Sequence, residues 1–346
     1  MRVLQEAWPR VPAARFFRAL RNRDIRVNGR RVRDDGPVQP GDRIEVYLPD
    51  SDFLAQEGAD GSGLPDDDRP DYLVVHTDGH LLVVSKAQGL SIHSGEDEEG
   101  SNLVDRIRED FGDRDIRLCH RLDRNTGGLV MLGRDDRTLR TVAQAMRDGA
   151  ILKRYRCLVS GVPDMGVPVR CADGTAMKEI RDSWEKPAGG RIRQVHIHAG
   201  EEAGDRPVAT RYRVLAVHRG VGPEGSDASE LEVELVTGKT HQIRAHFAFH
   251  GHPVLGDGRY GKNTINRHYR LRRQQLWSVS LDFRKIPKES GHPLSNVAGR
   301  LFRIEPEYDD PRFRSGKAGG RSPSPGGRSR EGSPSSRRGQ RRKDQR

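Results

Sequence analysis

The stretch His120-Arg121-Leu122-Asp123-Arg124-Asn125-Thr126-Gly127-Gly128 places one carboxylate between two arginines, beside a histidine and ahead of paired glycines. The apolar run 129–132 follows at once and predicts a buried strand. Asp123 is therefore expected on a tight loop held by rigid structure, where catalytic groups are often found. Flanking cations favour the ionised form of a carboxylate, so Asp123 could be a nucleophile, a general base or a metal ligand. Alternatively, Asp123 caps a turn and pairs with Arg121 or Arg124.

The charge of this 346-residue chain is unevenly distributed. Residues 1–48 carry a net charge of +5, residues 50–71 a net charge of −7, and residues 311–346 a net charge of +10. The chain is long enough for more than one domain. We expect a basic module at 1–48, an acidic linker at 49–70, a folded catalytic body at 71–310 and a disordered basic tail at 311–346. Basic segments at both ends suit a polyanion such as nucleic acid, although solubility alone would explain the tail.

The cysteines and the apolar runs exclude several classes of protein. Cys119, Cys157 and Cys171 have no C-x-x-C spacing, which indicates neither a disulfide framework nor a zinc knuckle. The first ten residues are charged and lack the apolar core of a signal peptide. No apolar run approaches the roughly 20 residues that span a bilayer. We therefore expect a cytoplasmic protein without a membrane span, acting as a monomer.

The N-terminal module has the pattern of a helix followed by strands. Residues 12–20 fit an amphipathic helix. Residues 25–27 alternate like a strand and end in Asn28-Gly29, a strong signal for a tight turn, and residues 43–48 alternate again.

The run from Pro12 to Val46 resembles an S4 domain, a small RNA-binding fold. That resemblance implies that basic side chains of the helix and of the following strand hold RNA phosphates rather than read bases. The candidates for this role are Arg15, Arg18, Arg21 and Arg26. An ordinary solvated helix face is the alternative.

The body shows many strand patterns and few helical ones. Strands are expected at 73–75, 81–84, 129–132, 155–159, 208–217, 231–235 and 276–283. Apolar residues recur at helical spacing from 139 to 146, and a second helix is expected from Thr240, as its N-terminal cap, to His250. Residues 161–206 are polar and glycine-rich, so we expect an irregular insertion there.

Three motifs in the body match known patterns only superficially. Gly238-Lys239-Thr240 lacks the earlier glycine of a phosphate-binding loop, because position 233 is Val. The G-x-G-x-x-G pattern at 256–261 does not head a strand–helix–strand unit, so dinucleotide binding is not expected. Four histidines at 241, 246, 250 and 252 invite a metal site, but their spacing is not H-E-x-x-H and no carboxylate lies between them. We expect no metal.

Four segments of the body, in this order, resemble the motifs of the RluA family of RNA pseudouridine synthases. They are HLLVVSKAQGLSIHSG (80–95), HRLDRNTGGLVML (120–132), LKRYRCLVSG (152–161) and ELVTGKTHQIRAHFAFHGHPVLGDGRYG (234–261). The resemblance covers roughly residues 72–305. Together with the S4-like module it points to the ribosomal-RNA branch, closest to RluC-type enzymes of the large subunit.

The resemblance implies roles for three residues. Asp123 takes the position of the essential aspartate, Tyr155 that of the active-site tyrosine, and Arg244 that of the arginine that pairs with the aspartate. The chain departs from the family at Gly127, where Ser is common, at Ala87, where Pro is common, and at Lys239, where Arg is common. All three departures spare the three residues.

The implied reaction explains these residue types. Turning uridine into pseudouridine breaks the N1–C1′ bond, rotates the uracil and forms a C5–C1′ bond, so neither a cofactor nor a metal is expected. The base must be flipped into a pocket. Asp123 would attack the nucleotide or take its C2′ proton, and the sequence leaves both open. Arg244 would keep Asp123 ionised, and Tyr155 would stack on the uracil and assist proton loss from C5. Further candidates for RNA contacts or loop support are His120, Arg121, Arg124, Lys239 and His241.

The implied fold is α+β, with a mixed, mainly antiparallel sheet, flanking helices and a catalytic cleft across the middle of the sheet. The implied partner is RNA, either 23S ribosomal RNA or the assembling large ribosomal subunit. Two other functions stay open at this point. One is a non-catalytic ribosome-assembly factor that binds RNA through the S4-like module. The other is a metal-dependent hydrolase built on the histidine cluster.

Overall fold

The structure is a computed structural model. It describes residues 2–8, 16, 19–20, 23–32, 36–47, 70–93, 102–185, 195–200 and 206–313. Most of the expected helix at 12–20, with Arg15, Arg18 and Arg21, lies outside these residues. So do the acidic linker, apart from its last residue, and all but the first three residues of the basic tail.

The N-terminal module contains helix α1 (Arg2–Ala7) and a small antiparallel sheet with strand order β2-β1-β3. Its strands are β1 (Ile25–Val27), β2 (Arg30–Arg31) and β3 (Ile44–Val46). Asn28 and Gly29 connect β1 to β2 with φ values of 52° and 76°. These are the positive values that the tight turn between two antiparallel strands requires, so the turn expected at Asn28-Gly29 is confirmed.

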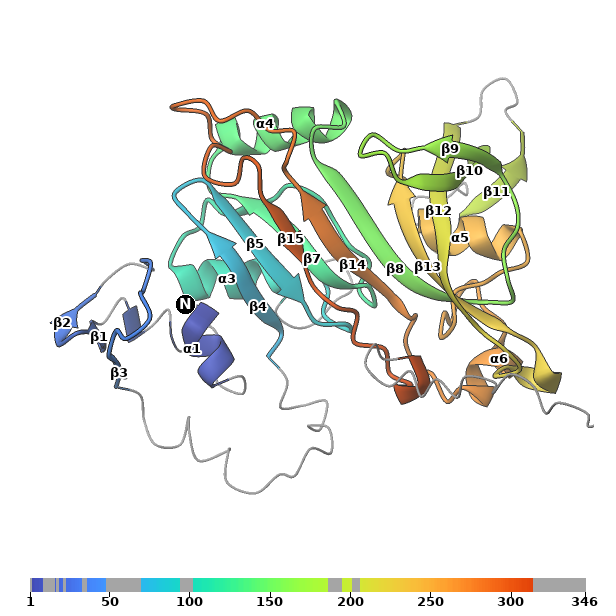
Figure 1. The fold of residues 1–346 in the computed structure, drawn as a ribbon, viewed down its shortest axis with the longest axis horizontal. Coiled ribbons are helices and arrows are strands. Elements are labelled where there is room, and N and C mark those ends of the chain that lie inside the picture. Colours follow the sequence, from blue (N-terminus) through green and yellow to red (C-terminus); the bar gives the residue numbers. More distant parts are fainter. Residues whose placement is uncertain are drawn as a thin grey trace, which may run out of the picture. The chain divides into compact units, whose positions relative to one another are not determined.

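The body is built on one twelve-stranded sheet (Figure 1). Its strands are β4 (Tyr72–Thr77), β5 (Leu81–Lys86), β6 (Arg117–Leu118), β7 (Gly127–Gly133), β8 (Leu152–Ser160), β9 (Val167–Arg170), β10 (Ala176–Glu185), β11 (His196–Ala199), β12 (Arg206–His218), β13 (Ala228–Leu235), β14 (Leu276–Asp282) and β15 (Leu301–Arg303). The main path runs β11-β10-β12-β13-β8-β14-β7-β5-β4. Among these described strands, only β14 and β7 pair in parallel. The mixed, mainly antiparallel sheet confirms the expected α+β class.

The helices of the body are short. They are α3 (Leu103–Phe111), α4 (Asp136–Arg147), α5 (Gln242–Phe249) and α6 (Asn263–His268), with 3-10 turns η4 (Pro223–Gly225) and η5 (Pro311–Phe313). In the described part of the chain, no helix has the length and apolar character needed to cross a membrane.

Strand β7 is buried along its whole length because helices cover both faces of the sheet around it. Val130 and Leu132 belong to one apolar cluster that also contains Leu103 and Ile107 of α3. Leu129 and Met131 belong to a second cluster, together with Val142 of α4. Because side chains alternate across a strand, a continuous apolar run is the pattern of a strand that is buried on both faces. The buried strand expected after Asp123 is confirmed.

The paired glycines at the start of β7 allow it to lie against β14. Gly127 pairs with Trp277, and a Cβ atom at position 127 would lie 2.5 Å from the Trp277 ring. Gly128 pairs with Ser278, and a Cβ atom there would lie 2.2 Å from the Ser278 carbonyl oxygen. Side chains at these positions would push β7 off β14. The glycines therefore fix the end of the Asp123 loop against the centre of the sheet.

The expectation of an irregular insertion at 161–206 is wrong, because β9, β10 and β11 lie within it. In β10, Met177, Ile180 and Trp184 are buried. The charged residues between them conceal the strand pattern, since Glu179 is itself buried and accepts a hydrogen bond from Arg211 at 2.6 Å. A strand whose polar side chains are paired across the sheet carries little apolar periodicity.

Thr240 is not the cap of its helix. Helix α5 begins at Gln242, after His241 in the left-handed conformation with φ 55°. The Gln242 side chain organises the entry to the helix, because its Oε1 accepts hydrogen bonds from Lys239 N at 3.0 Å and from Thr237 Oγ1 at 2.9 Å. The expected helix exists, but a side chain inside it replaces the predicted cap.

Candidate active site

Asp123 and Arg244 meet although 121 positions separate them in the sequence. Asp123 lies on the loop before β7, and Arg244 lies in α5. Arg244 Nη1 donates to Asp123 Oδ2 at 2.7 Å, and the two side chains are 9% and 25% exposed, respectively. No described residue donates to the other oxygen, Oδ1. The Asp123 carboxylate therefore pairs with Arg244 rather than with Arg121 or Arg124, and it keeps one oxygen open.

Asp257 holds the other side of the Arg244 guanidinium. Nε and Nη2 of Arg244 donate to the two oxygens of Asp257 at 2.7 and 3.0 Å. The Asp257 side chain is fully buried and also accepts from the amides of Arg259 and Tyr260. Burial alone would lower the pKa of Arg244, but Asp257 and then Asp123 raise it above its usual value. Arg244 is thus a fixed cation that presents one N–H to Asp123.

Asp257 was missed by the sequence analysis. It lies in the glycine-rich segment 256–261, which was considered only as a dinucleotide motif. A charged residue between two glycines, shortly after the apolar pair Val254-Leu255, was the available signal.

Tyr155 lies in β8, two strands from β7 in the sheet, and is 5% exposed. Burial raises the pKa of its hydroxyl, and the negative charge of Asp123 raises this pKa further. The side chain therefore stays a neutral phenol at physiological pH. It can offer a ring face for stacking and an O–H donor, and it is poorly suited to act as a phenolate base.

Lys86 anchors the Asp123 loop through a hydrogen bond to the Arg124 carbonyl oxygen. Its side chain at the end of β5 is fully buried, and Nζ donates to the carbonyl oxygens of Ala87, Leu90 and Arg124 at 2.8, 3.0 and 2.9 Å. Burial lowers the pKa of Lys86 to about 7, while the charge of Asp123 raises it. Only an ammonium has three N–H donors for three carbonyls, so the geometry favours the charged form. Lys86 thereby joins the first motif to the Asp123 loop.

The residues flanking Asp123 have different surroundings. Arg124 Nε donates to Gly89 O at 2.8 Å, a contact that supports the loop. His120 Nε2 accepts from the Met131 amide at 3.1 Å, and burial lowers the pKa of His120 well below its usual value. Arg121 is exposed, with Nη1 3.5 Å from His93 Nε2. The exposed guanidinium of Arg121 has no carboxylate partner among the described residues.

His241 and Lys239 lie at the start of α5. His241 Nδ1 is 2.9 Å from the Tyr260 hydroxyl, which accepts from the Val195 amide at 2.9 Å. The phenol proton is therefore directed to Nδ1, and the neutral imidazole carries its own proton on Nε2. Burial lowers the pKa of His241 to about 4, against the opposing charge of Asp123. Lys239 is partly exposed, and its ammonium contacts no carboxylate of the described residues.

Of the four basic residues expected to bind RNA in the N-terminal module, the structure describes one. Arg26 is partly exposed on β1, with its guanidinium 5.1 Å from the centre of the Tyr47 ring. This stacking leaves the outer edge of the guanidinium available for a phosphate.

The chain is similar to known proteins over most of its length. A family model described as RNA pseudouridylate synthase matches residues 80–249, which include Asp123, Tyr155 and Arg244. The ribosomal large subunit pseudouridine synthase C of Escherichia coli O157:H7 is 28% identical over 306 residues, covering 87% of this chain and 86% of that protein. The protein of the same name from Buchnera aphidicola is 26% identical over 304 residues, covering 85% and 88%. The solved structure of human RNA pseudouridylate synthase domain containing 1 has a TM-score of 0.48 at 23% identity, over 61% of this chain and 78% of that chain.

The family model and the curated relatives confirm the recognition made from the four motifs. They leave the metal-dependent hydrolase without support. Residues 80–249 match the RNA pseudouridylate synthase family, and 85–87% of the chain is similar to ribosomal large subunit pseudouridine synthases.

Proposed function

We propose that the protein isomerises specific uridines of 23S ribosomal RNA to pseudouridine, with Asp123 as the catalytic carboxylate. The observation that carries the proposal is the pairing of Asp123 Oδ2 with Arg244 Nη1 at 2.7 Å, which leaves Oδ1 open. The large-subunit substrate is supported by the names of the relatives from Escherichia coli and Buchnera. We also propose that the protein works as a monomer in the cytoplasm, and light scattering on the purified chain tests the oligomeric state.

The open oxygen of Asp123 has two possible tasks. In one, Oδ1 bonds to the nucleotide as the N1–C1′ electrons leave on the uracil, and the bond is released when C5 joins C1′. In the other, Oδ1 takes the C2′ proton as the uracil leaves and returns it after C5 has joined C1′. Both routes need an ionised carboxylate, and both end with a proton lost from C5 and one gained at N1.

The neighbours of Asp123 fit either route. Arg244 is immobilised by Asp257, so it can orient the carboxylate without reorganising during the reaction. Tyr155 is a neutral, buried aromatic residue and can hold the detached uracil by stacking. Arg121, Lys239 and His241 surround the loop and the start of α5, where they can contact the phosphates and the flipped base.

The proposal is tested by mapping pseudouridines across ribosomal RNA with carbodiimide and primer extension, because isomerisation leaves the mass unchanged. Cells that lack the protein are compared with cells given back the wild type or Asp123→Ala. We expect specific stops to vanish and to return only with the wild type. Stops that return with Asp123→Ala would refute the catalytic role of Asp123. Identical maps in all strains would refute ribosomal RNA as the substrate, and the same mapping on transfer RNA would follow.

A further inference from the structure

Helix α5 carries two histidines on a face that does not include Arg244. His246 and His250 are one helical turn apart, and both direct Nε2 at the same carboxylate oxygen, Oδ2 of Asp182 in β10. The two N···O distances are 2.8 and 2.7 Å. One ligand atom from each of the three residues lies within 4.8 Å of the others. The fold thus brings the Asp182 carboxylate to two imidazoles that lie more than 60 positions further along the chain.

We propose that Asp182, His246 and His250 bind a divalent transition-metal ion of the zinc class. Two imidazole nitrogens and one carboxylate oxygen form a donor set that zinc accepts with a water as fourth ligand. Histidines at i and i+4 on one helix face are a common way to supply two of those donors. Two imidazoles that bind through their lone pairs and one carboxylate place a single negative charge at the site, which attracts a divalent cation.

The surroundings of the three side chains suit a bound ion. Thr210 Oγ1 lies 2.9 Å from His246 Nδ1 and accepts from Gln242 Nε2 at 3.0 Å. An imidazole that binds a metal through Nε2 carries its proton on Nδ1. This N–H can donate to Thr210 Oγ1, which also accepts from Gln242, and the hydrogen bond fixes the orientation of the ring. The side chains of His246 and Asp182 are 0% and 5% exposed, whereas that of His250 is 25% exposed. An ion and a water ligand can enter past His250.

Little movement is needed to accommodate the ion. Metal–ligand distances of about 2.0–2.2 Å in a tetrahedral site place neighbouring ligand atoms about 3.3 Å apart. The N···O distances at Asp182 would therefore lengthen by about half an ångström, which a rotation of the carboxylate provides. The metal would tie α5, and with it Arg244, to β10, so it would act on the stability of the fold rather than in the reaction.

A purely hydrogen-bonded cluster has the same residues in contact. If both histidines are neutral and carry the proton on Nε2, both donate to Asp182 Oδ2 and every group is satisfied. The two alternatives differ at Asp182→Asn. An amide oxygen still accepts hydrogen bonds from the histidines, but it is a poor ligand for zinc.

The test uses the full chain purified without a histidine tag, stripped with a chelator and then titrated with Zn²⁺ or Co²⁺ alone. We expect one Zn²⁺ per chain after gel filtration, visible absorption bands from bound Co²⁺, and a higher melting temperature with Zn²⁺. His250→Ala and Asp182→Asn should weaken Zn²⁺ binding by more than the about 10–100-fold that loss of a hydrogen-bond partner of a ligand costs. Circular dichroism of the stripped variants shows whether they fold.

His252→Ala is the matched control, because His252 follows His250 by two residues in the chain but contacts Ser160 O at 2.9 Å instead. It should bind Zn²⁺ as the wild type does. Two results would overturn the proposal. One is a wild type that retains no Zn²⁺ above background and gives no Co²⁺ bands. The other is a folded Asp182→Asn variant that binds Zn²⁺ as tightly as the wild type.

Discussion

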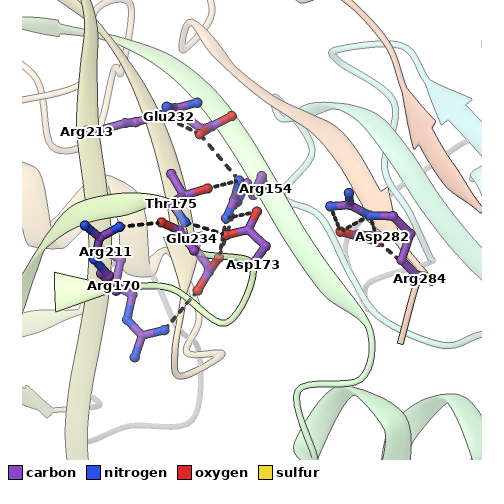
Figure 2. A network of polar contacts seen from close by, with 11 residues as sticks. Arg154, Arg170, Asp173, Thr175, Arg211, Arg213, Glu232, Glu234, Asp282 and Arg284 are labelled. Carbon is purple, nitrogen blue, oxygen red and sulfur yellow. Dashed lines mark hydrogen bonds and ion pairs between the residues drawn. The ribbon is translucent and has the colours of Figure 1, made fainter. Parts of the chain in front are cut away.

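Arg154 and Arg244 each hold two carboxylates at hydrogen-bond distance, and Arg154 also lies 3.7 Å from Glu232. The two arginines differ in how many oxygens of those paired carboxylates remain without a donor. In the Arg154 cluster (Arg154, Asp173 and Glu234), Arg154 lies 2.8 Å from Asp173 Oδ2 and 3.1 Å from Glu234 Oε2 (Figure 2). The remaining oxygens also have donors, because Glu234 Oε1 accepts from Arg211 and Asp173 Oδ1 from the Thr175 amide, both at 3.0 Å. All four oxygens are occupied, so the cluster stabilises and cannot react.

The Arg244 cluster (Asp123, Arg244 and Asp257) also joins one arginine to two carboxylates, but one of its carboxylate oxygens has no donor among the described residues. Asp257 is occupied on both oxygens, whereas Asp123 is occupied on one. Tyr155 and Arg154 are neighbours on β8 and therefore face opposite sides of the sheet. One strand thus serves the candidate site on one face and the saturated cluster on the other. An open carboxylate oxygen, rather than the ion pair itself, distinguishes the reactive acid.

The largest expected effect comes from making the same change in both clusters. Asp123→Asn should lower kcat by at least about 100-fold, the smallest loss expected of a general base, and by far more if Asp123 bonds to the nucleotide. Asp173→Asn removes an equal charge from a saturated acid and should leave kcat unchanged. Single-turnover assays on a ribosomal RNA fragment measure both. Equal losses of kcat in the two variants would remove the distinction between the clusters.

The arginines should differ in both stability and activity. Arg244→Met leaves the fully buried Asp257 without its cation, which costs about 3–5 kcal/mol, and it also frees Asp123. Arg154→Met should cost less stability, because Glu234 keeps Arg211 and Asp173 keeps Thr175. Urea unfolding measures the free energies, and kcat is compared below the onset of unfolding. Arg244→Met should lose activity there and Arg154→Met should not. A catalytically normal Arg244→Met would contradict the role of this arginine.

Substitution of Lys86 shows whether the activity of Asp123 depends on the anchoring of its loop. Lys86→Met removes three donors and leaves three carbonyl oxygens unpaired, so the free energy of unfolding should fall by about 3 kcal/mol or more. The activity of the folded fraction should fall as well, because the Asp123 loop loses its anchor at Arg124 O. Lys239→Met is the control for stability, since Lys239 is partly exposed and should change it little. A Lys86→Met protein as stable as the wild type would show that the contacts with the loop are dispensable.

The sequence predicted the parts of the site that lie on strong local patterns. The apolar run after Asp123 and the alternation around Tyr155 are visible in any short window, and both strands are confirmed. The α5 helix was also found, although not its cap. The meeting of Asp123 with Arg244 came from the family resemblance, because no local pattern joins residues 121 positions apart.

The parts that the sequence did not predict depend on partners from distant strands. Asp257 is a single charge in a glycine-rich loop until Arg244 contacts it. Strand β10 carries so many charges that its apolar positions are hidden, and the partner of its buried Glu179 is Arg211 on β12. Asp182, on that same strand, could not be joined to His246 and His250 before the strand itself was known. The structural role of such a polar residue can be predicted only when its partner in the fold is known.

The smallest effect concerns the pH dependence of the saturated cluster. Burial by itself raises the pKa of Asp173, but the hydrogen bonds from Arg154 and Thr175 lower it below its usual range. A lowered folded-state pKa adds stability that is complete above the unfolded pKa of about 3.9 and is lost as the pH falls through the folded value. Asp173→Asn should therefore cost about 1 kcal/mol at pH 7 and progressively less below pH 4.

Thermal unfolding of the wild type and of Asp173→Asn at a series of pH values measures this difference. A gap in melting temperature that closes towards low pH would mean that the charge of Asp173 is what the cluster uses. A gap that stays constant would mean that only the hydrogen-bond geometry matters, since an amide changes the geometry equally at every pH. In that case the two clusters would differ in a second way besides the open oxygen. The Arg154 cluster would not depend on the charge of Asp173, whereas Asp123 has to be charged to react by either route.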